Sequence, residues 1–539
     1  MYRRYFAAAA CLIAVCSCTD RTPESPLQKK VDAYAVYQIG SPYMDGLTDN
    51  GKEVLNLFRM AADEIDHIYW QQSFGDKSVF ESLPEGPERS YAMINYGPWD
   101  RLDNNAVFIE GYGERPAGAR FYPEDMTREE FDAFDDPLKL NPYTLIRRGE
   151  DGKLKTVWYH EEYAESIDRI ARYLESAATM TIKESVRNYL LKRADALRTD
   201  DYYESDLAWM DMKDSKMDLV IGPIEDYEDG INGVKTAYEC FILLKDLKKT
   251  DELTKYIAML PDLQKELPCP EEYKTFVPGT ESDMFVYDAI YYSGDANAGS
   301  KTIAINLPND TRVQAEKGTR RLQLRNVIKA KFDKIVYPIG QILFEPEQQR
   351  YLSADAFFWN VTFHEVAHGL GIKNTVNGKG NVREALANYY SSWEEAKADI
   401  LGLYMVCSLI DKGEISGITK DDAMATFIAG ILRSVRFGAA SAHGVANMMC
   451  FNFLEDHKAF TQNAEGLYVI NFDNAKKAMD AWAAKILEVE GLGDLAEAKA
   501  YSEKNGQIRP ALQKSLDKIN SLGIPKDIRY EQGRKVLGL

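Results

Sequence analysis

The chain has 539 residues, of which 45% are hydrophobic and 28% are charged, and this balance excludes a disordered chain and a transmembrane protein. Its 84 acidic residues outnumber its 65 lysines and arginines, which gives a formal net charge of -19. Because nucleic-acid binding requires basic grooves that replace the counterions of the phosphates, we expect no nucleic-acid partner and no adsorption of the folded body to anionic membranes.

The first 17 residues have the pattern of a secretory signal peptide. Two arginines precede an apolar run over residues 6–15, which is too short for a permanent membrane-spanning helix. The Val-Cys-Ser-Cys sequence that ends at Cys18 resembles the lipobox of bacterial lipoproteins, so we expect lipidation of Cys18 and a tether over residues 18–30. This pattern predicts a lipid-anchored protein of the cell envelope, on its periplasmic or surface face, that meets the membrane only through the anchor. An ordinary signal peptide cleaved nearby is the alternative.

Four cysteines follow the anchor, and none of them belongs to a Cys-x-x-Cys pair. Four thiols in a chain of this length are too few for a disulfide framework or a thiolate zinc site. We therefore expect all four to be small buried side chains. They are Cys240, Cys269, Cys407 and Cys450.

Helical and strand-like patterns alternate along the chain. Apolar residues recur at helical spacing in several segments, and β-branched and aromatic residues gather in others. A stretch rich in Gly, Pro and aromatic residues, 91–154, is expected to form loops with short strands. The remaining expected elements are helices at 52–72, 161–210 and 250–267, strands at 217–244, 283–292 and 301–307, and almost continuous helix from about 321 to 504.

The strongest chemical signal is a His-Glu-x-x-His motif in the apolar helical segment 357–368. His364 and His368 are four residues apart, so their imidazoles lie on one face of a helix, one turn apart, and can bind one metal ion. Glu365 lies beside them, where a carboxylate can take a proton from a water molecule. The alternative is a buried helix whose histidines are hydrogen-bonded core residues.

A second helical segment supplies a third metal ligand. A catalytic zinc site has three protein ligands and one open position, and Glu395 can complete the set. Asp399, four residues later on the same face, can accept the ring N–H of one ligand histidine, and Glu394 can hold the other. The alternative is a helix start with a capping box, because Ser391 and Ser392 each precede a glutamate by three residues.

The two motifs together resemble those of the dipeptidyl-peptidase III family of zinc metallopeptidases. Three further segments, in the same order along the chain, extend the resemblance over about residues 218–447. They are Ile221–Tyr227, which resembles an Ile-Gly-x-Ile-Glu-x-Tyr segment, Leu267–Pro270, which matches Leu-Pro-x-Pro, and Ile305–Asn309, which resembles an Asn-x-Pro-Asn signature.

One departure from the family pattern concerns the zinc motif. The family's usual motif has one extra residue between the glutamate and the second histidine, whereas this chain has the ordinary pentapeptide. Histidines at i and i+4 fit a regular helix, so zinc binding is expected. The shape of the cleft, the substrate preference and the rate are the properties that this difference puts in question.

The resemblance also implies a reaction and a set of roles. It implies one Zn²⁺ per chain and release of dipeptides from the N-terminus of short peptides. Tyr227 is then the hydrogen-bond donor to the developing oxyanion, and His443 contacts the scissile region. Glu225 binds the free ammonium group of the substrate, and Asn306 and Asn309 hold its backbone. Without the resemblance, Tyr227 would be a core tyrosine, Glu225 part of a solvated acidic turn, and the asparagines turn formers.

The fold implied by the resemblance is α+β and mostly helical, with two lobes around a cleft. We expect a mixed α/β lobe with a β-barrel-like core and the substrate-binding strands over residues 31–325. Residues 250–275 of this part are candidates for packing against the other lobe. A helical zinc-binding lobe is expected over 326–510, followed by a C-terminal segment over 511–539.

Two other functions compete with a dipeptidyl peptidase. A zinc peptidase of different specificity is compatible with the pentapeptide motif. A surface-anchored peptide-binding protein without turnover is a second alternative, but such a protein has no need of Glu365. The Gly-x5-Glu-x7-Arg-Glu-x-x-Glu-Glu pattern of nucleotide hydrolases does not occur in the sequence.

Overall fold

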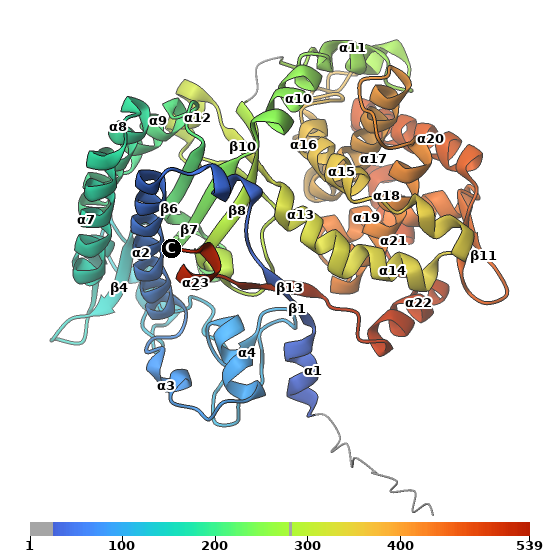
Figure 1. Ribbon diagram of the computed structural model, residues 1–539. Helices are drawn as coiled ribbons and strands as arrows, with labels where there is room; N and C mark the ends of the chain where they lie inside the picture. Colours follow the sequence, from blue (N-terminus) through green and yellow to red (C-terminus); the bar gives the residue numbers. More distant parts are fainter. Residues whose placement is uncertain (1–24, 280–282) are drawn as a thin grey trace, which may run out of the picture.

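The computed structural model describes residues 25–279 and 283–539, which form two lobes side by side (Figure 1). The predicted signal peptide and Cys18 lie outside the described residues. One lobe contains the main β-sheet and the helices that cover it, and we call it the sheet lobe. The other is built almost entirely of helices, and we call it the helical lobe.

The sheet lobe contains a five-stranded sheet in the order β6-β7-β8-β10-β9. β6, β7 and β8 are antiparallel neighbours, β10 runs parallel to β8, and β9 is antiparallel to β10. All nine residues of β7 are buried, as expected of a central strand that is covered on both faces. The strand bounds are Met217–Glu225 for β6, Ala237–Lys245 for β7, Asp283–Gly294 for β8, Ala304–Leu307 for β9 and Arg320–Leu324 for β10.

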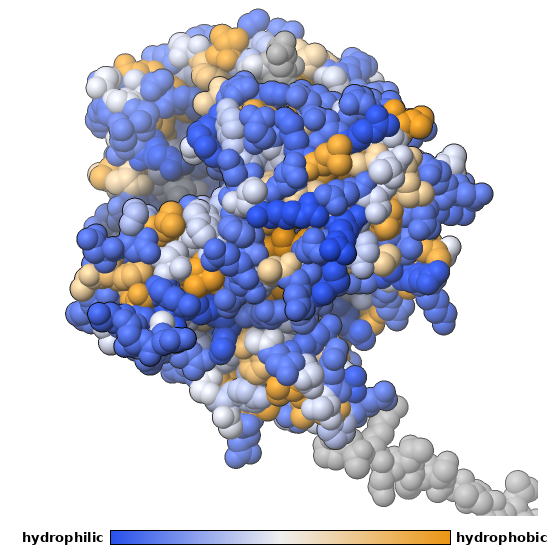
Figure 2. All heavy atoms as spheres, turned by 90° about the vertical axis from the view of Figure 1, so that its left-hand side faces the viewer, coloured by the Kyte–Doolittle hydropathy of each residue, from blue (hydrophilic) through white to orange (hydrophobic). Residues whose placement is uncertain are grey.

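Helix α2, Asp49–Ser73, packs on β7 and β8, and α7 packs on the outer side of α2. The apolar residues of α2 recur every three or four positions, which gives the helix a buried face and a solvated face. From this side the molecule presents a mainly hydrophilic surface with scattered apolar side chains (Figure 2). Further helices of the sheet lobe include α4 Pro87–Asn95, α7 Ala164–Met180, α8 Glu184–Thr199, α9 Tyr203–Asp211 and α12 Thr311–Lys317.

The helical lobe is centred on α15 and α17, which pack against each other along much of their length. Both have nearly continuous apolar sequences because neighbouring helices surround them. Its helices are α13 Arg325–Lys331, α14 Tyr337–Leu343, α15 Ala354–Ala367, α16 Val382–Leu386, α17 Tyr390–Asp411, α18 Lys420–Ser434, α19 Ala442–Asp456, α20 Phe472–Leu492, α21 Leu495–Asn505 and α22 Pro510–Ser521.

The single helix predicted at 250–267 is wrong. The segment forms two helices, α10 Leu247–Ile257 and α11 Leu260–Lys265. Pro261 explains the break, because its ring clashes with the carbonyl four residues earlier and it has no N–H to donate. Both helices lie beside the helical lobe, where the side-chain amide of Gln264 exchanges two hydrogen bonds with the backbone of Gly371, at 3.0 and 2.9 Å.

The expectation of nearly continuous helix after residue 321 also needs correction. β10 continues to Leu324, and a hairpin of β11 Phe460–Gln462 and β12 Tyr468–Ile470 interrupts the helices. After α22 the chain returns to the sheet lobe, where β13, Asp527–Glu531, pairs in parallel with β1, Tyr34–Gln38. Strand pairing across such a sequence separation leaves no local pattern that could predict it. No helix among the described residues is long and apolar enough to cross a membrane.

Candidate active site

The two histidines of the His-Glu-x-x-His motif lie at the C-terminal end of α15. Ser353 caps the start of this helix, with its hydroxyl accepting a hydrogen bond from the amide of Ala356 at 3.3 Å. His364 lies in the last turn and His368 directly follows the last helical residue, still with helical backbone angles. Their ring centroids are 5.0 Å apart. The i and i+4 spacing therefore brings both imidazoles to one side of the helix, as the sequence predicted.

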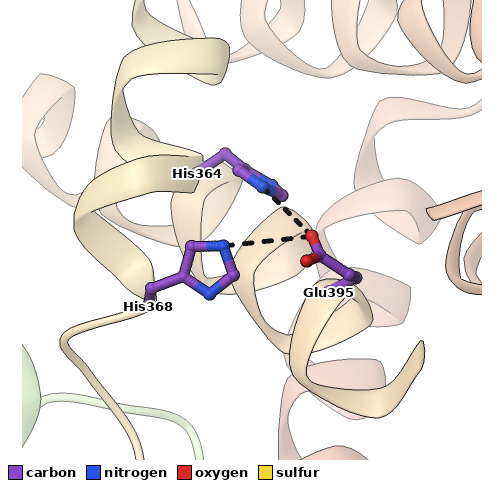
Figure 3. Close-up of side chains that lie close together, drawn as sticks. All are labelled: His364, His368 and Glu395. Atoms are coloured by element: carbon purple, nitrogen blue, oxygen red, sulfur yellow. Dashed lines mark ion pairs between the residues drawn. The ribbon is translucent and has the colours of Figure 1, made fainter. Parts of the chain in front are cut away.

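Glu395 reaches the same point from the second turn of α17. Its Oε2 atom lies 3.4 Å from Nε2 of His364 and 3.9 Å from Nε2 of His368. One ligand atom from each of the three residues lies within 4.8 Å of the others, and the three side chains converge in Figure 3. The capping-box alternative is wrong, because α17 begins at Tyr390, so the two serines lie inside the helix and not at its N-cap.

The chemistry of this group fits a catalytic zinc ion. Two imidazoles and one carboxylate are a known ligand set for catalytic zinc, and they leave one coordination position open. The Oε2 atom of Glu395 is buried and receives no hydrogen bond from any described residue, which leaves an orphaned acceptor where three ring nitrogens face it. A divalent cation would satisfy this atom and both histidines at once.

Each ligand histidine is held from behind by a carboxylate. Nδ1 of His364 lies 2.7 Å from Oδ1 of Asp399, and Nδ1 of His368 lies 3.0 Å from Oε1 of Glu394. With each Nδ1–H donating to a carboxylate, each Nε2 keeps a lone pair for the metal. Burial opposes charge on His364, but Asp399 and Glu395 outweigh it and raise the pKa of His364 well above its usual range. Protons therefore compete with metal for this ring.

Glu394 is itself fixed by neighbours that the sequence analysis did not identify. Nζ of Lys397 donates to Oε2 of Glu394 at 2.7 Å, and the hydroxyl of Tyr390 donates to the same atom at 3.2 Å. Lys397 is fully buried, so this ion pair is shielded from water. The i, i+3 spacing of Glu394 and Lys397 indicates an ion pair on one helix face. The same spacing is common on exposed helix faces, so it does not show that the pair is buried.

Gly402 is a second residue that the sequence analysis missed. It lies on α17 at the point where this helix crosses α15. A Cβ atom at this position would lie 2.8 Å from the backbone nitrogen of His364 and 3.0 Å from the carbonyl carbon of Phe363. Only glycine lets the two helices approach this closely, so Gly402 sets the distance between the helices that carry the ligands. A lone glycine within an apolar helix is the signal that could have indicated it.

Glu365 lies next to the first ligand on α15 and is half-buried. Arg321 of β10 donates from Nη1 to the backbone carbonyl of Glu365 at 2.9 Å, so the sheet lobe contacts the zinc helix at this residue. Arg321 also lines a cavity of about 430 Å³ between the lobes, together with Val366 and Gly369 beside the zinc helix. Glu365 therefore lies on α15 where the two lobes meet.

His443, in the first turn of α19, also faces the metal group. Ser441 caps this helix by accepting from the amide of Gly444 at 3.1 Å. Nε2 of His443 lies 3.1 Å from Oε2 of Glu395, and its ring stacks over that of His364 with centroids 6.3 Å apart. The side chain is 64% exposed, so this side of the group is open to solvent and to a substrate.

The predicted substrate-binding residues lie together on the sheet lobe. Glu225 ends β6, and Asn309 follows β9 and donates to the backbone carbonyl of Ile224 at 3.2 Å. Burial raises the pKa of the Glu225 carboxyl, although Asn309 opposes this shift. Asn306 lies within β9 with its side chain exposed, and Tyr227 follows β6 and is 81% exposed.

Glu225 and Tyr227 thus lie at the end of β6 and directly after it. Asn306 lies in the edge strand β9, and Asn309 lies just after that strand. Within residues 25–279 and 283–539, no hydrogen bond or ion pair joins any of these four side chains to the zinc ligands. The predicted site residues therefore form two groups, one on each lobe. A bound substrate or a closing movement of the lobes would have to bridge the gap between these groups.

Comparisons with known proteins identify the family and the fold. The profile of peptidase family M49 matches residues 147–384. The fold is similar to that of DPP III from Caldithrix abyssi, with a TM-score of 0.89 and 35% identity over 95% of this chain and 100% of that chain. Dipeptidyl-peptidase III from Corallococcus sp. strain EGB gives a TM-score of 0.77 and 34% identity over 95% and 98% of the two chains. An Arabidopsis thaliana protein named Nudix hydrolase 3 is 30% identical over 569 residues, 93% of this chain and 73% of its own.

The two-lobed fold and the matched family profile are those of a peptidase. The chain belongs to peptidase family M49, the dipeptidyl-peptidase III family. The family predicted from the sequence and the predicted fold class, α+β and mostly helical with two lobes, are both confirmed.

Proposed function

We propose that this protein is a zinc-dependent peptidase that releases dipeptides from the N-terminus of short peptides. The observation that carries the proposal is the convergence of His364, His368 and Glu395, with a carboxylate behind each histidine and Glu365 beside the first. A structural metal site does not require an adjacent free carboxylate or an open side. Family membership supports peptide hydrolysis as the reaction.

The residues of the site have different roles in the proposed reaction. A zinc ion held by the three ligands would supply a Lewis acid for the peptide carbonyl and for the attacking water. Glu365 takes a proton from that water and delivers it to the leaving amine. Asp399 and Glu394 keep the ligand rings in the orientation that exposes Nε2. His443, on the open side of the group, contacts the scissile region.

The sheet lobe supplies recognition of the substrate. Glu225 binds the free ammonium group, which selects a peptide with an unblocked N-terminus, and the two asparagines of the β9 region hold the backbone. The hydroxyl of Tyr227 donates to the carbonyl oxygen as negative charge develops on it. The nearby Glu225 carboxylate raises the pKa of Tyr227, so this hydroxyl keeps its proton as a donor. Because these groups lie on the lobe opposite the zinc ligands, catalysis requires the lobes to close on the peptide.

We further propose that the protein acts in the cell envelope, anchored by a lipid on Cys18. The basic and apolar pattern before this cysteine supports the proposal. The net charge of -19 supports short peptides rather than nucleic acids as partners. A peptidase at this location would act on peptides outside the cytoplasm.

The pentapeptide spacing of the zinc motif favours a second candidate, a zinc peptidase with another specificity. Both candidates use Glu365 in the same way, but they differ in the need for a free N-terminus. Assays with matched peptides, one with a free and one with an acetylated N-terminus, distinguish them. Release of dipeptides from the free peptide alone supports the first candidate, whereas equal cleavage of both supports the second.

The general-base assignment is tested with Glu365→Ala. We expect the variant to keep its zinc and to lose at least about two orders of magnitude in kcat, because it removes proton transfer and no ligand. Glu347→Ala, at an exposed position of the same lobe, serves as the control and should match the wild type. Loss of zinc from the Glu365 variant, or activity close to that of the wild type, would contradict the assignment.

A further inference from the structure

A second cavity lies in the sheet lobe, and none of the residues of the proposed active site lines it. It has a volume of about 730 Å³ and lies between α2, α4, the end of β8 and β13. These elements meet in the lower central part of Figure 1. Trp70, Tyr96, Tyr291 and Tyr530 form its aromatic walls. Cavities of this size and character accommodate small organic molecules.

The two carboxylates of α2 that line the cavity are already neutralised. Asp63 forms an ion pair with Arg59 and accepts a hydrogen bond from the hydroxyl of Tyr291 at 2.6 Å. Asp66 accepts from the hydroxyl of Tyr96 and lies 3.3 Å from Nζ of Lys77. Neither carboxylate is therefore free to bind a cationic ligand. A third carboxylate of the lining, Glu85, is exposed and forms no ion pair among the described residues.

Three cations that line the same cavity lack such partners. Within the described residues, no carboxylate lies within 4.0 Å of the charged nitrogens of Lys301, Arg89 or Arg529. Lys301 is only 4% exposed, and among the described residues its Nζ donates to the carbonyl of Asn297 and lies 5.8 Å from the centroid of the Tyr530 ring. Nε of Arg529 is buried with no hydrogen-bond acceptor among the described residues. Arg89 donates from Nη1 to the carbonyl of Leu83 at 3.4 Å. Buried donors without acceptors are costly, so an anion that reached Nε of Arg529 would satisfy a group that the described protein atoms leave unpaired.

The start of α4 faces the same space. Gly86, the N-cap residue, has no side chain to accept a hydrogen bond from the first-turn amides, and the helix has no other side-chain cap. Gly86, Arg89 and Ser90 all line the cavity. An uncapped helix N-terminus favours negative charge through its free N–H groups and its dipole. Burial lowers the pKa of Lys301 to about 7, and a bound anion would favour its charged form.

We propose that this cavity binds a small organic anion that carries a carboxylate or phosphate group. Lys301, Arg89 and Arg529, together with the start of α4, would hold the acidic group, and the aromatic walls would pack against its carbon skeleton. The cavity lining has four basic side chains and three carboxylates, a small positive excess in a protein whose net charge is -19. The site is separate from the zinc group and does not depend on the proposed peptidase activity.

Calorimetric titration of the full folded chain with citrate and, separately, with inorganic phosphate tests the proposal. We expect saturable binding of at least one of them at constant ionic strength. Arg89→Gln and Arg529→Gln should each weaken that binding at least about tenfold, because each removes a charge-assisted hydrogen bond. Arg350→Gln, which removes an exposed arginine of the helical lobe, should leave binding unchanged.

Two results would overturn the proposal. One is the absence of saturable binding for both anions. The other is binding that is equally strong in the two cavity variants and in the Arg350 control. If citrate binds and phosphate does not, the ligand is a carboxylate, and the reverse result identifies a phosphate. Because Arg89 is half-buried and at the edge of the cavity, its variant is expected to fold, and circular dichroism of each variant verifies this.

Discussion

Replacement of Gly402 by alanine is expected to weaken zinc binding without changing any ligand. The new Cβ atom would lie 2.8 Å from the backbone nitrogen of His364, whereas ordinary contact begins at 3.4 Å. The difference, 3.4 minus 2.8 Å, requires α15 and α17 to separate locally by about 0.6 Å. Ligand distances at a zinc site tolerate only about 0.2 Å. Because two ligands are on α15 and the third is on α17, the separation acts directly on the site.

We expect the affinity of Gly402→Ala for zinc to fall about 10–100-fold, the range seen when ligand-orienting groups are disturbed. Overpacking should lower the free energy of unfolding of the metal-free protein by about 1–3 kcal/mol, reduced by the roughly 1 kcal/mol that alanine gains in a helix. Zinc competition against a fluorescent chelator measures the first quantity, and urea denaturation measures the second.

Gly430→Ala on α18 is the matched control. Its Cβ atom would lie 3.5 Å from Cε2 of Phe357, an ordinary contact, so only the helix-propensity gain of up to about 1 kcal/mol is expected. If Gly402→Ala binds zinc as tightly as Gly430→Ala and is as stable, the close approach of the two helices does not control the site, and the reasoning fails.

Three other predictions concern the zinc ligands, a buried acid and the anchor. Glu395→Ala should lower zinc content sharply, whereas Glu394→Ala should keep most of its zinc with about 10–100-fold weaker affinity; the opposite order in metal analysis would refute the ligand assignment. Burial, opposed by hydrogen bonds from His160, raises the pKa of Asp200 to about 6, so the folded state binds this proton more tightly than the unfolded state does. Wild-type stability should therefore fall relative to Asp200→Asn as pH rises from about 4 to 6, by at most about 3 kcal/mol, and a pH-independent difference in urea denaturation would contradict this. Cys18→Ala should abolish partitioning into detergent, and unchanged partitioning would rule out the anchor.

The sequence allowed prediction of those parts of the site that depend on local helical spacing. His364 and His368 are four residues apart at the end of α15, Glu395 and Asp399 are four residues apart on α17, and a regular helix forms at each motif. The close packing of α15 against α17 could not be predicted from such spacing. Its determinant, Gly402, acts through a backbone contact with residues about 40 positions earlier, and no local pattern reports such a contact.

The sequence also did not predict which charged side chains are buried or where a helical segment is interrupted. The sequence does not show that Lys397 is fully buried, because its spacing to Glu394 is equally common on solvated helices. The segment 250–267 has helical periodicity throughout, and this masked the break that Pro261 imposes. The cations of the second cavity come from three distant parts of the chain, Arg89, Lys301 and Arg529, so only the folded structure brings them together.

The position of α10 beside the helical lobe has a consequence for how the protein can be divided and how it forms. Tyr256 of α10 lies with its ring centroid 5.4 Å from that of Trp359 and 6.1 Å from that of Phe363, so it covers the apolar side of the zinc helix. A fragment that begins at Arg325 would lack this cover and would expose both rings to solvent. Conversely, a fragment that ends at Leu324 would leave β1 without β13, its partner from the other end of the sequence. The cover of the zinc helix is therefore synthesised before the helical lobe, whereas the sheet lobe receives β13 only after the whole helical lobe has been synthesised.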